Sequence, residues 1–309
     1  NLLQKLPQLA NADLVRTRDA AEIAKGTIVV DVGAEYVPEQ HRYDHHQRGF
    51  FETFDAEHKT KLSSAGLVWK HFGQDILAAH MNVDVSDERV PLLHKKMYDD
   101  FVEAIDAIDN GIALYPDAAG EPAYKSRTDL SSRVGFMNPR WNEPFDDADL
   151  LARFRRASAM AGGEFFDRVN DALYAWLPAR DIVVQVLKDR KSFEGADAQG
   201  RILLFDRAVG WKGHIYDLET AFEIPEEEKP LYVVYPDESG KWRVQAVPVN
   251  SESFESRKAL PEAWRGIRDA QLSELSGIPE CVFVHQSGFI GGNATKDGAL
   301  AMATKALDM

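Results

Sequence analysis

Side chains of the kind that bind divalent metal ions occur at three places in the first 110 residues. The run Tyr43-Asp44-His45-His46-Gln47 combines a carboxylate with two adjacent imidazoles. Asp31 follows an apolar, β-branched run, and Asp109 ends an amphipathic stretch. Mg²⁺ and Mn²⁺ prefer oxygen ligands, and Mn²⁺ also accepts an imidazole. These residues predict a metal centre that could activate water for attack at phosphorus.

Each of these residues also has a purely structural interpretation. Asp31-Val32-Gly33 could be the exit of a strand into a turn, and Asp109-Asn110-Gly111 is a good helix end. Adjacent histidines after an acid have no general structural use, yet a single triplet is weak evidence. The metal hypothesis therefore requires that the three places meet in the folded chain. The remaining histidines of this region are interpreted as surface or packing residues: His41, His58, His71, His80 and His94.

The elements that would position these groups appear as hydrophobic patterns. Residues 27–33 predict a strand that places Asp31 at its carboxyl end, where ligands bind in open α/β sheets. Residues 13–16 are a weaker strand candidate. Ser63 predicts the cap of a helix over 63–73 with a glycine stop, and apolar residues spaced by three or four predict a long helix over 88–109.

The rest of the chain predicts helices followed by strands. We expect a helix over 146–176, a shorter one from Pro178, and strands over 202–205, 231–235 and 242–247. The last two strands predict a hairpin. The resulting fold class is α/β, with an N-terminal parallel sheet flanked by helices and a smaller C-terminal α/β domain. The predicted division is a metal-binding catalytic domain over 1–140, a helical connector over 141–200 and a substrate-binding domain over 201–309.

Composition limits the classes of function. Of 309 residues, 44% are hydrophobic and 28% charged, which is typical of a soluble globular protein. No stretch approaches the roughly 18 to 20 apolar residues of a membrane span, so we expect no membrane partner and an intracellular location. Cys281 is the single cysteine, which excludes an intrachain disulfide. The net charge of −14 runs against a basic nucleic-acid footprint; carboxylates that load cations explain part of it, and an ordinary acidic surface explains it equally well.

A glycine-rich segment near the end could hold an anion. Residues 287–295 follow a strand through Val284 and precede a helix through Leu300, so backbone N–H groups would point at a phosphate. An ordinary glycine-rich turn explains the pattern equally well. Arg265 and Arg268 are weaker candidates for holding a nucleic-acid backbone, since isolated arginines are more often solvated. The candidate substrate-binding residues of this region are Arg265, Arg268, His285, Ser287, Gly288, Gly291 and Gly292.

Several segments together resemble one family. The sequence over 31–73, including the Asp44-His45-His46 run and Ser63-Ser64-Ala65-Gly66, is similar to the Myg1 exonuclease family, within the broader DHH phosphoesterases. The resemblance continues through almost the whole chain. Its other matching segments are 101–112, 176–180, 264–269, 276–279 and 283–292.

The resemblance implies a DHH-type parallel sheet and a two-metal phosphodiesterase that uses Mn²⁺ or Mg²⁺. Asp31 resembles the carboxylate that bridges two ions, His45 the metal-binding imidazole, and Asp109 the carboxylate that completes the second metal. His46 is similar to the histidine near the substrate phosphate, with Asp44 as its supporting acid. Two ions would activate a water molecule, so no protein nucleophile is required.

The chain departs from the family pattern in two places. Family members carry an upstream motif of His and Asp residues that supplies further metal ligands, and this chain begins after it, so we expect an incomplete centre here. Asn293 stands after Gly291-Gly292 where related DHH enzymes often place a histidine.

The leading functional hypothesis is a 3′–5′ exoribonuclease that acts on the 3′ end of single-stranded RNA, a polarity and polymer implied only by the resemblance. The resemblance also implies nucleus and mitochondrion, with cytoplasm left open, and the oligomeric state stays open with a homodimer among the options. Two alternatives remain. One is hydrolysis of small nucleotides or phosphoanhydrides by a phosphodiesterase or pyrophosphatase, and the other is a non-catalytic RNA-binding or scaffold protein.

Overall fold

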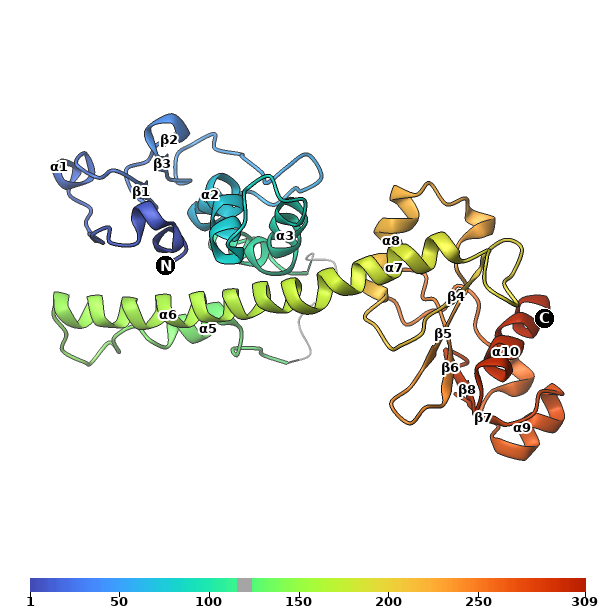
Figure 1. Cartoon of the computed structure of the whole chain (residues 1–309). Coiled ribbons are helices and arrows are strands. Elements are labelled where there is room, and N and C mark those ends of the chain that lie inside the picture. Colours follow the sequence, from blue (N-terminus) through green and yellow to red (C-terminus); the bar gives the residue numbers. More distant parts are fainter. Residues whose placement is uncertain (116–123) are drawn as a thin grey trace. The chain divides into compact units, whose positions relative to one another are not determined.

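The chain folds into two compact units of mixed α/β structure. A computed structural model describes residues 1–115 and 124–309 (Figure 1). The units are Asn1–Leu173 and Tyr174–Met309. The predicted α/β class is confirmed. The roles expected for 1–140, 141–200 and 201–309 stay predictions.

The sheet of the N-terminal unit is small and mixed. Its strands are β1 (Val29–Val30), β2 (Tyr36–Val37) and β3 (Arg42–Tyr43), in the order β1-β3-β2. β1 runs parallel to β3, whereas β2 is antiparallel to it. An extended parallel sheet is therefore not seen within residues 1–115 and 124–173. The short helices of this region are η1 (Leu3–Lys5), η2 (Pro7–Leu9), α1 (Ala20–Ile23) and η3 (Pro38–Gln40).

Two of the strand predictions need correction. Residues 13–16 form no strand, and their apolar side chains Leu14 and Val15 are exposed, so no burial supports extended pairing. The strand predicted over 27–33 ends at Val30. Asp31 and Gly33 both have positive φ, 68° and 98°, which turns the chain out of the extended conformation.

Helix α2 (Ser64–Met81) carries the predicted serine cap. The Ser63 hydroxyl accepts hydrogen bonds from the backbone N–H groups of Ala65 and Gly66. The predicted stop at Gly73 is wrong, because the helix continues to Met81 and ends at the left-handed Asn82. Gly73 instead permits close helix packing, since a Cβ there would lie 2.6 Å from the imidazole of His94.

The predicted helix over 88–109 is confirmed with one irregularity. It consists of α3 (Arg89–Met97), a π-helical turn η4 (Tyr98–Val102) and α4 (Glu103–Asp109). This helical run packs against α2 through side chains with essentially no exposure, among them Leu67, Trp69, Leu93 and Met97. The N-terminal unit also contains α5 (Leu130–Gly135) and α6 (Asp147–Asp171), and a second π-helical turn η6 (Ala172–Trp176) follows α6.

The C-terminal unit is built on a five-stranded sheet in the order β4-β5-β6-β8-β7. β4 and β5 are parallel and the other pairs antiparallel, and the predicted hairpin between β5 and β6 is confirmed. The strands are β4 (Ile202–Leu204), β5 (Tyr232–Pro236), β6 (Trp242–Ala246), β7 (Cys281–Val284) and β8 (Ile290–Asn293). The helices are α7 (Leu177–Asp189), α8 (Lys212–Ala221), η7 (Glu226–Glu228), η8 (Glu262–Trp264), α9 (Asp269–Ser276) and α10 (Lys296–Asp308).

Each face of this sheet has its own hydrophobic core. The helices α9 and α10 lie on one side of the sheet (Figure 1). The core on that side includes Val244, Ala246 and Val284. On the other face, α7 and α8 bury Leu203 and Val233. Among the described residues no helix is long and apolar enough to cross a membrane.

Candidate metal centre

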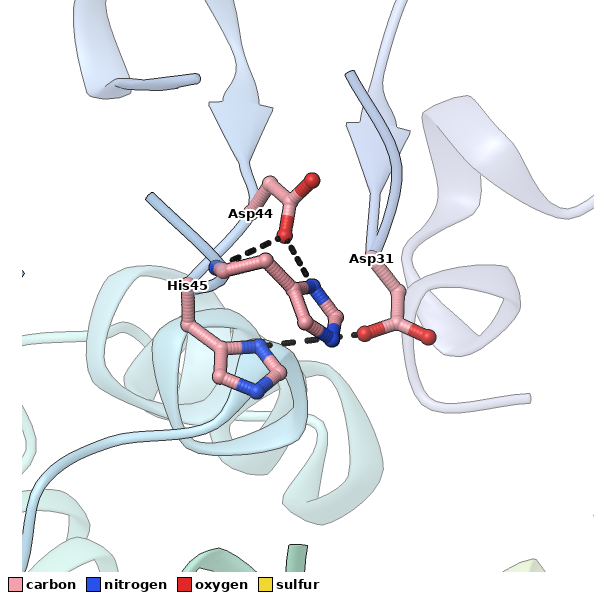
Figure 2. Close-up of side chains that lie close together, drawn as sticks. Asp31, Asp44 and His45 are labelled. Atoms are coloured by element: carbon pink, nitrogen blue, oxygen red, sulfur yellow. Dashed lines mark hydrogen bonds and ion pairs between the residues drawn. The ribbon is translucent and has the colours of Figure 1, made fainter. Parts of the chain in front are cut away.

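The parallel pairing of β1 and β3 brings two of the predicted site segments together. Val30 pairs with Tyr43, so Asp31 and Asp44 follow neighbouring strands at the same edge. Figure 2 shows Asp31, Asp44 and His45 gathered where these strands end. One ligand atom from each of Asp31, Asp44, His45 and His46 lies within 4.8 Å of the others. The residues chosen for their chemistry therefore do meet in space.

Asp31 presents its carboxylate from a turn. Its backbone N–H donates to the Tyr43 carbonyl at 3.1 Å, which extends the β1–β3 pairing by one residue. Its φ of 68° is left-handed, a conformation that aspartate adopts more readily than most residues. The side chain is 62% exposed, and one carboxylate oxygen lies 3.8 Å from His45 Nδ1. Asp31 thus keeps oxygen lone pairs free for a cation.

His45 is buried and held from the start of α2. The Ser64 backbone N–H donates to Nδ1 at 3.1 Å, and the Ser64 hydroxyl lies 3.0 Å from the same nitrogen. Burial lowers the pKa of His45, aided by the neighbouring His46 and opposed by Asp109 and Asp31. The imidazole is therefore neutral near pH 7, which is the form that binds metals.

Asp109 approaches His45 from the other side. One of its carboxylate oxygens lies 3.3 Å from His45 Nε2, and its side chain is 51% exposed. It ends α4, so its position depends on how that helix is fixed against α2. The third predicted ligand is therefore also part of the cluster.

Asp44 and His46 form a tight pair. His46 Nδ1 lies 2.6 Å from one Asp44 carboxylate oxygen, and the other oxygen accepts from the Ala34 backbone N–H at 2.7 Å. Burial alone would raise the pKa of Asp44, but these hydrogen bonds lower it below its usual value. The hydrogen bond to Asp44 in turn raises the pKa of His46. Both Asp44 oxygens are thus engaged, and its place in the structure is to orient His46.

Asp106 is a residue of this region for which no role was predicted. It has no exposed surface, and one carboxylate oxygen accepts from Ser63 N–H (2.9 Å), the Ser63 hydroxyl (2.7 Å) and Gly66 N–H (3.0 Å). The Tyr98 hydroxyl donates to the other oxygen at 3.1 Å. Burial raises the pKa of Asp106 to about 6, although the hydrogen bonds oppose that shift. Asp106 therefore joins α4, which ends in Asp109, to the start of α2, which holds His45.

The π-helical turn explains how Asp106 and Tyr98 reach the same point. They are eight residues apart, and at ~100° per residue a regular α-helix would separate their directions by ~80°. The π-helical turn adds one residue, so the separation corresponds to seven helical steps, or ~20°. Gly66 completes the arrangement, because a Cβ at that position would overlap the Asp106 carboxylate.

Apart from His46, the predicted substrate-binding residues lie in the C-terminal unit. Gly288 occupies the turn of the β7–β8 hairpin with a φ of 76°, and the His285 and Ser287 side chains contact each other at 2.9 Å beside it. The continuous loop predicted over 287–295 is wrong in its middle, because Gly291 and Gly292 lie within β8 and pair on both sides.

The remaining candidates there have mainly structural contacts. Arg265 donates to the Leu260 carbonyl at 2.9 Å. Asn293 is fully buried and donates to the Pro279 carbonyl at 2.7 Å. Its side-chain oxygen accepts from the backbone N–H of Thr295, the residue that caps α10, at 2.9 Å. Binding roles for Arg265, Arg268, His285, Ser287, Gly288, Gly291 and Gly292 stay predictions.

The fold and the cluster define an α/β protein with a group of Asp and His residues suited to a metal ion. Comparison with known sequences places it more closely: the model of the MYG1 exonuclease family, described as an uncharacterised protein family (UPF0160), matches residues 1–307. The chain belongs to this family, as the sequence resemblance predicted.

Curated relatives match over nearly the whole chain. A protein named MYG1 exonuclease from Mus musculus is 48% identical over 99% of this chain and 80% of its own length. The human protein of the same name is 47% identical over 99% of this chain and 81% of its own. A MYG1 protein from Dictyostelium discoideum is 45% identical over 99% and 91%. No solved structure matches the chain.

Proposed function

We propose that the protein is a metal-dependent 3′–5′ exoribonuclease whose centre is the Asp31–His45–Asp109 group. The observation that carries the proposal is the meeting of these residues at the ends of β1, β3 and α4, with a neutral, buried imidazole between two exposed carboxylates. Membership in a family whose mammalian members are named exonucleases supports the same reading.

The donor set fits Mn²⁺ or Mg²⁺. Asp31 and Asp109 would supply hard oxygen ligands and His45 one nitrogen. Asp44 and Asp106 are saturated with hydrogen bonds, so they would support the site without binding the ion. When bound, two such ions lower the pKa of a water molecule and neutralise charge at phosphorus.

The Ser64 backbone N–H donates to His45 Nδ1, so the proton of the neutral ring sits on Nε2, which lies 3.3 Å from an Asp109 oxygen. A cation at Nε2 would require that proton to move to Nδ1, where the Ser64 hydroxyl, 3.0 Å away, could accept it as a hydrogen bond. Hydrogen-bonded partners of this kind orient metal-binding histidines. Ser64 would therefore hold the His45 ring in place in either tautomer.

His46 would act on the substrate rather than on the metal. Asp44 holds its Nδ1 and raises its pKa, which favours the cation near neutral pH, and its side chain is 59% exposed. An imidazolium fixed at this edge can donate a hydrogen bond to a phosphate oxygen or a proton to the leaving group. Asp44 would thus act through His46.

The finer parts of the proposal rest on the family resemblance. These are the DHH superfamily membership, a centre of two ions, single-stranded RNA with a free 3′ end as partner, and residence in nucleus and mitochondrion.

The test is digestion of end-labelled RNA oligomers by the protein in the presence of Mn²⁺. We expect stepwise shortening from the 3′ end that is lost in Asp31→Ala and His45→Ala. His80→Ala is the matched control, because His80 lies in the last turn of α2, at the opposite end from Ser64, and contacts Asn170 of α6. Shortening from the 5′ end would contradict the polarity. Turnover of dinucleotides without turnover of longer RNA would replace the exoribonuclease by a small-nucleotide phosphodiesterase.

A further inference from the structure

One face of the C-terminal sheet carries partly exposed side chains on β5, β6 and β7. Residues paired across neighbouring strands point to the same face, and Tyr235, Arg243, Gly292 and Phe283 form one such row across β5, β6, β8 and β7. On this face α7 and α8 bury β4 and β5. The α9 and α10 helices belong to the core on the opposite face. Arg243 and Phe283, farther along the row, remain partly exposed.

The middle of the row lacks a side chain, which lets two arginines reach one aromatic ring. A Cβ at Gly292 would meet the Arg243 guanidinium, so this side chain lies across the glycine. Its guanidinium carbon is 5.2 Å from the centroid of the Phe283 ring. Arg268 forms a β-bridge with Phe283, and its guanidinium carbon is 5.7 Å from the same centroid.

Positive charge is in excess at this point. Arg243 is paired with Asp237, yet its Nη1 is buried and has no hydrogen-bond acceptor among the described residues. Among the residues that the structure describes, no carboxylate forms a salt bridge with Arg268. Two guanidinium groups against one carboxylate form a local cationic site in a chain of net charge −14. A buried donor without an acceptor is costly unless a ligand satisfies it.

A cavity of about 450 Å³ continues the same face toward α8. Tyr235 and Gln245 line it together with Trp211 and Lys212, and the Tyr235 hydroxyl donates to Gln245 Oε1 at 2.8 Å. This bond holds the Gln245 side chain in place at the cavity wall. Aromatic, amide and cationic groups therefore follow one another along one open surface.

We propose that this surface, defined by Arg243, Phe283, Arg268 and the Tyr235–Gln245 pair, binds the phosphodiester backbone and bases of single-stranded nucleic acid. The inference rests on the proposed nuclease function. Arginines beside an aromatic ring on an open sheet are the combination that single-strand binding proteins use, with cations on phosphates and planar groups stacking on bases. The ring already contacts both arginines, so they are held in position before a ligand arrives.

The test measures binding separately from cleavage. A fluorescent oligouridylate of about 12 nucleotides is titrated by anisotropy in EDTA, where the metal centre cannot act. We expect Arg268→Ala and Arg243→Gln each to weaken binding by about tenfold, and each to reduce the slope of log K against log salt concentration by about one. Arg207→Ala is the matched control, because Arg207 is an exposed arginine of the same unit paired with Asp206. It should change neither quantity.

A second substrate distinguishes the possible failures. Hydrolysis of a dinucleotide with Mn²⁺ requires the centre but little of the surface, so Arg268→Ala should retain it while losing turnover of the 12-mer. If RNA is bound but never cleaved, the proposed function fails and the surface stands. If RNA is cleaved while both arginine variants bind like Arg207→Ala, the surface is only an internal cation–π cluster and the inference is overturned. Should Arg243→Gln unfold in thermal melts, Arg268→Ala alone decides, because Arg268 is not packed over Gly292.

Discussion

Replacing Asp106 separates the charge of this carboxylate from its geometry. Asp106→Ala leaves Ser63 N–H, Gly66 N–H and the Tyr98 hydroxyl without a partner at a site with no exposed surface. Each unsatisfied buried donor costs about 1–3 kcal/mol, so the free energy of unfolding should fall by at least about 3 kcal/mol. Asp106→Asn keeps an oxygen for the two N–H donors, and its amide can donate to Tyr98. Its cost from lost bonds should be about 1 kcal/mol or less.

The titration of Asp106 makes the free energy of unfolding depend on pH with a definite sign. The pKa of Asp106 is raised to about 6 from an unfolded value of 3.8. Its contribution to stability is thus fully present below pH 3.8 and is lost as pH rises through 6, because the folded state holds a proton that the unfolded state releases. A shift of about two pH units corresponds to at most about 3 kcal/mol. Asp106→Asn does not titrate, so it should gain stability relative to the parent by up to that amount between pH 4 and pH 7.

The assay is urea unfolding at several pH values in EDTA, with Mn²⁺ titration calorimetry in parallel. We expect the Asn variant to bind Mn²⁺ like the parent, and the Ala variant to bind it at least tenfold more weakly, since Asp109 and Ser64 lose their common anchor. A difference between Asp106→Asn and the parent that does not change with pH would refute the titration. Equal Mn²⁺ affinity in all three proteins, with the Ala variant still folded, would refute the positioning role.

Three further outcomes follow from the same geometry. Ser64→Ala should weaken Mn²⁺ binding by about 10- to 100-fold in calorimetry with little change in melting temperature, because it removes the hydroxyl that would accept the Nδ1 proton of a metal-bound His45. His58 lies between Asp55 and Asp99. Burial opposes the charged form of His58, but its hydrogen bonds to the two carboxylates raise its pKa above 6.5. The stabilising effect of the charged His58 is therefore present below pH 6.5 and is lost as pH rises through the raised pKa. The gap in melting temperature between the parent and His58→Gln should be larger at pH 5.5 than at pH 8.5. Saturating Mn²⁺ at 100 times its Kd should raise the free energy of unfolding by about 2.7 kcal/mol, an increase that EDTA reverses.

The sequence predicted which candidate residues lie close together better than it predicted the sheet that carries them. Strand ends and unusual residue types identified Asp31 and the Asp44-His45-His46 run, but no pattern shows which two strands pair. The candidate over 13–16 failed because β-propensity reflects half-buried packing, and these side chains find no partner surface. Glycines disfavour strands, so Gly291-Gly292 predicted a loop. In the structure both glycines lie in β8, which pairs with β6 on one side and with β7 on the other. These hydrogen bonds outweigh the low strand preference of glycine, and the Arg243 side chain covers Gly292.

Asp106 escaped prediction for a different physical reason. An aspartate on an amphipathic helix is ordinarily assigned to the exposed face, and its spacing of three from Asp109 was its one available signal. The π-helical turn shifts the helix face by one residue after Tyr98, and hydrophobic spacing does not reveal such an insertion. Turns of this type occur frequently at functional sites, which agrees with its position about two helical turns before a candidate ligand, Asp109.

The division between exposed candidate ligands and buried supporting carboxylates explains how an acidic cluster could bind a cation at a defined place. Asp44 and Asp106 have 2% and 0% exposure and accept hydrogen bonds on both oxygens, so their carboxylates are already engaged and are not accessible to a cation. Asp31 and Asp109 are more than half exposed and keep their lone pairs. Unpaired carboxylates near each other repel, and a divalent ion relieves that repulsion. The buried pair fixes the geometry, the exposed pair supplies the charge, and His45 between them connects the two.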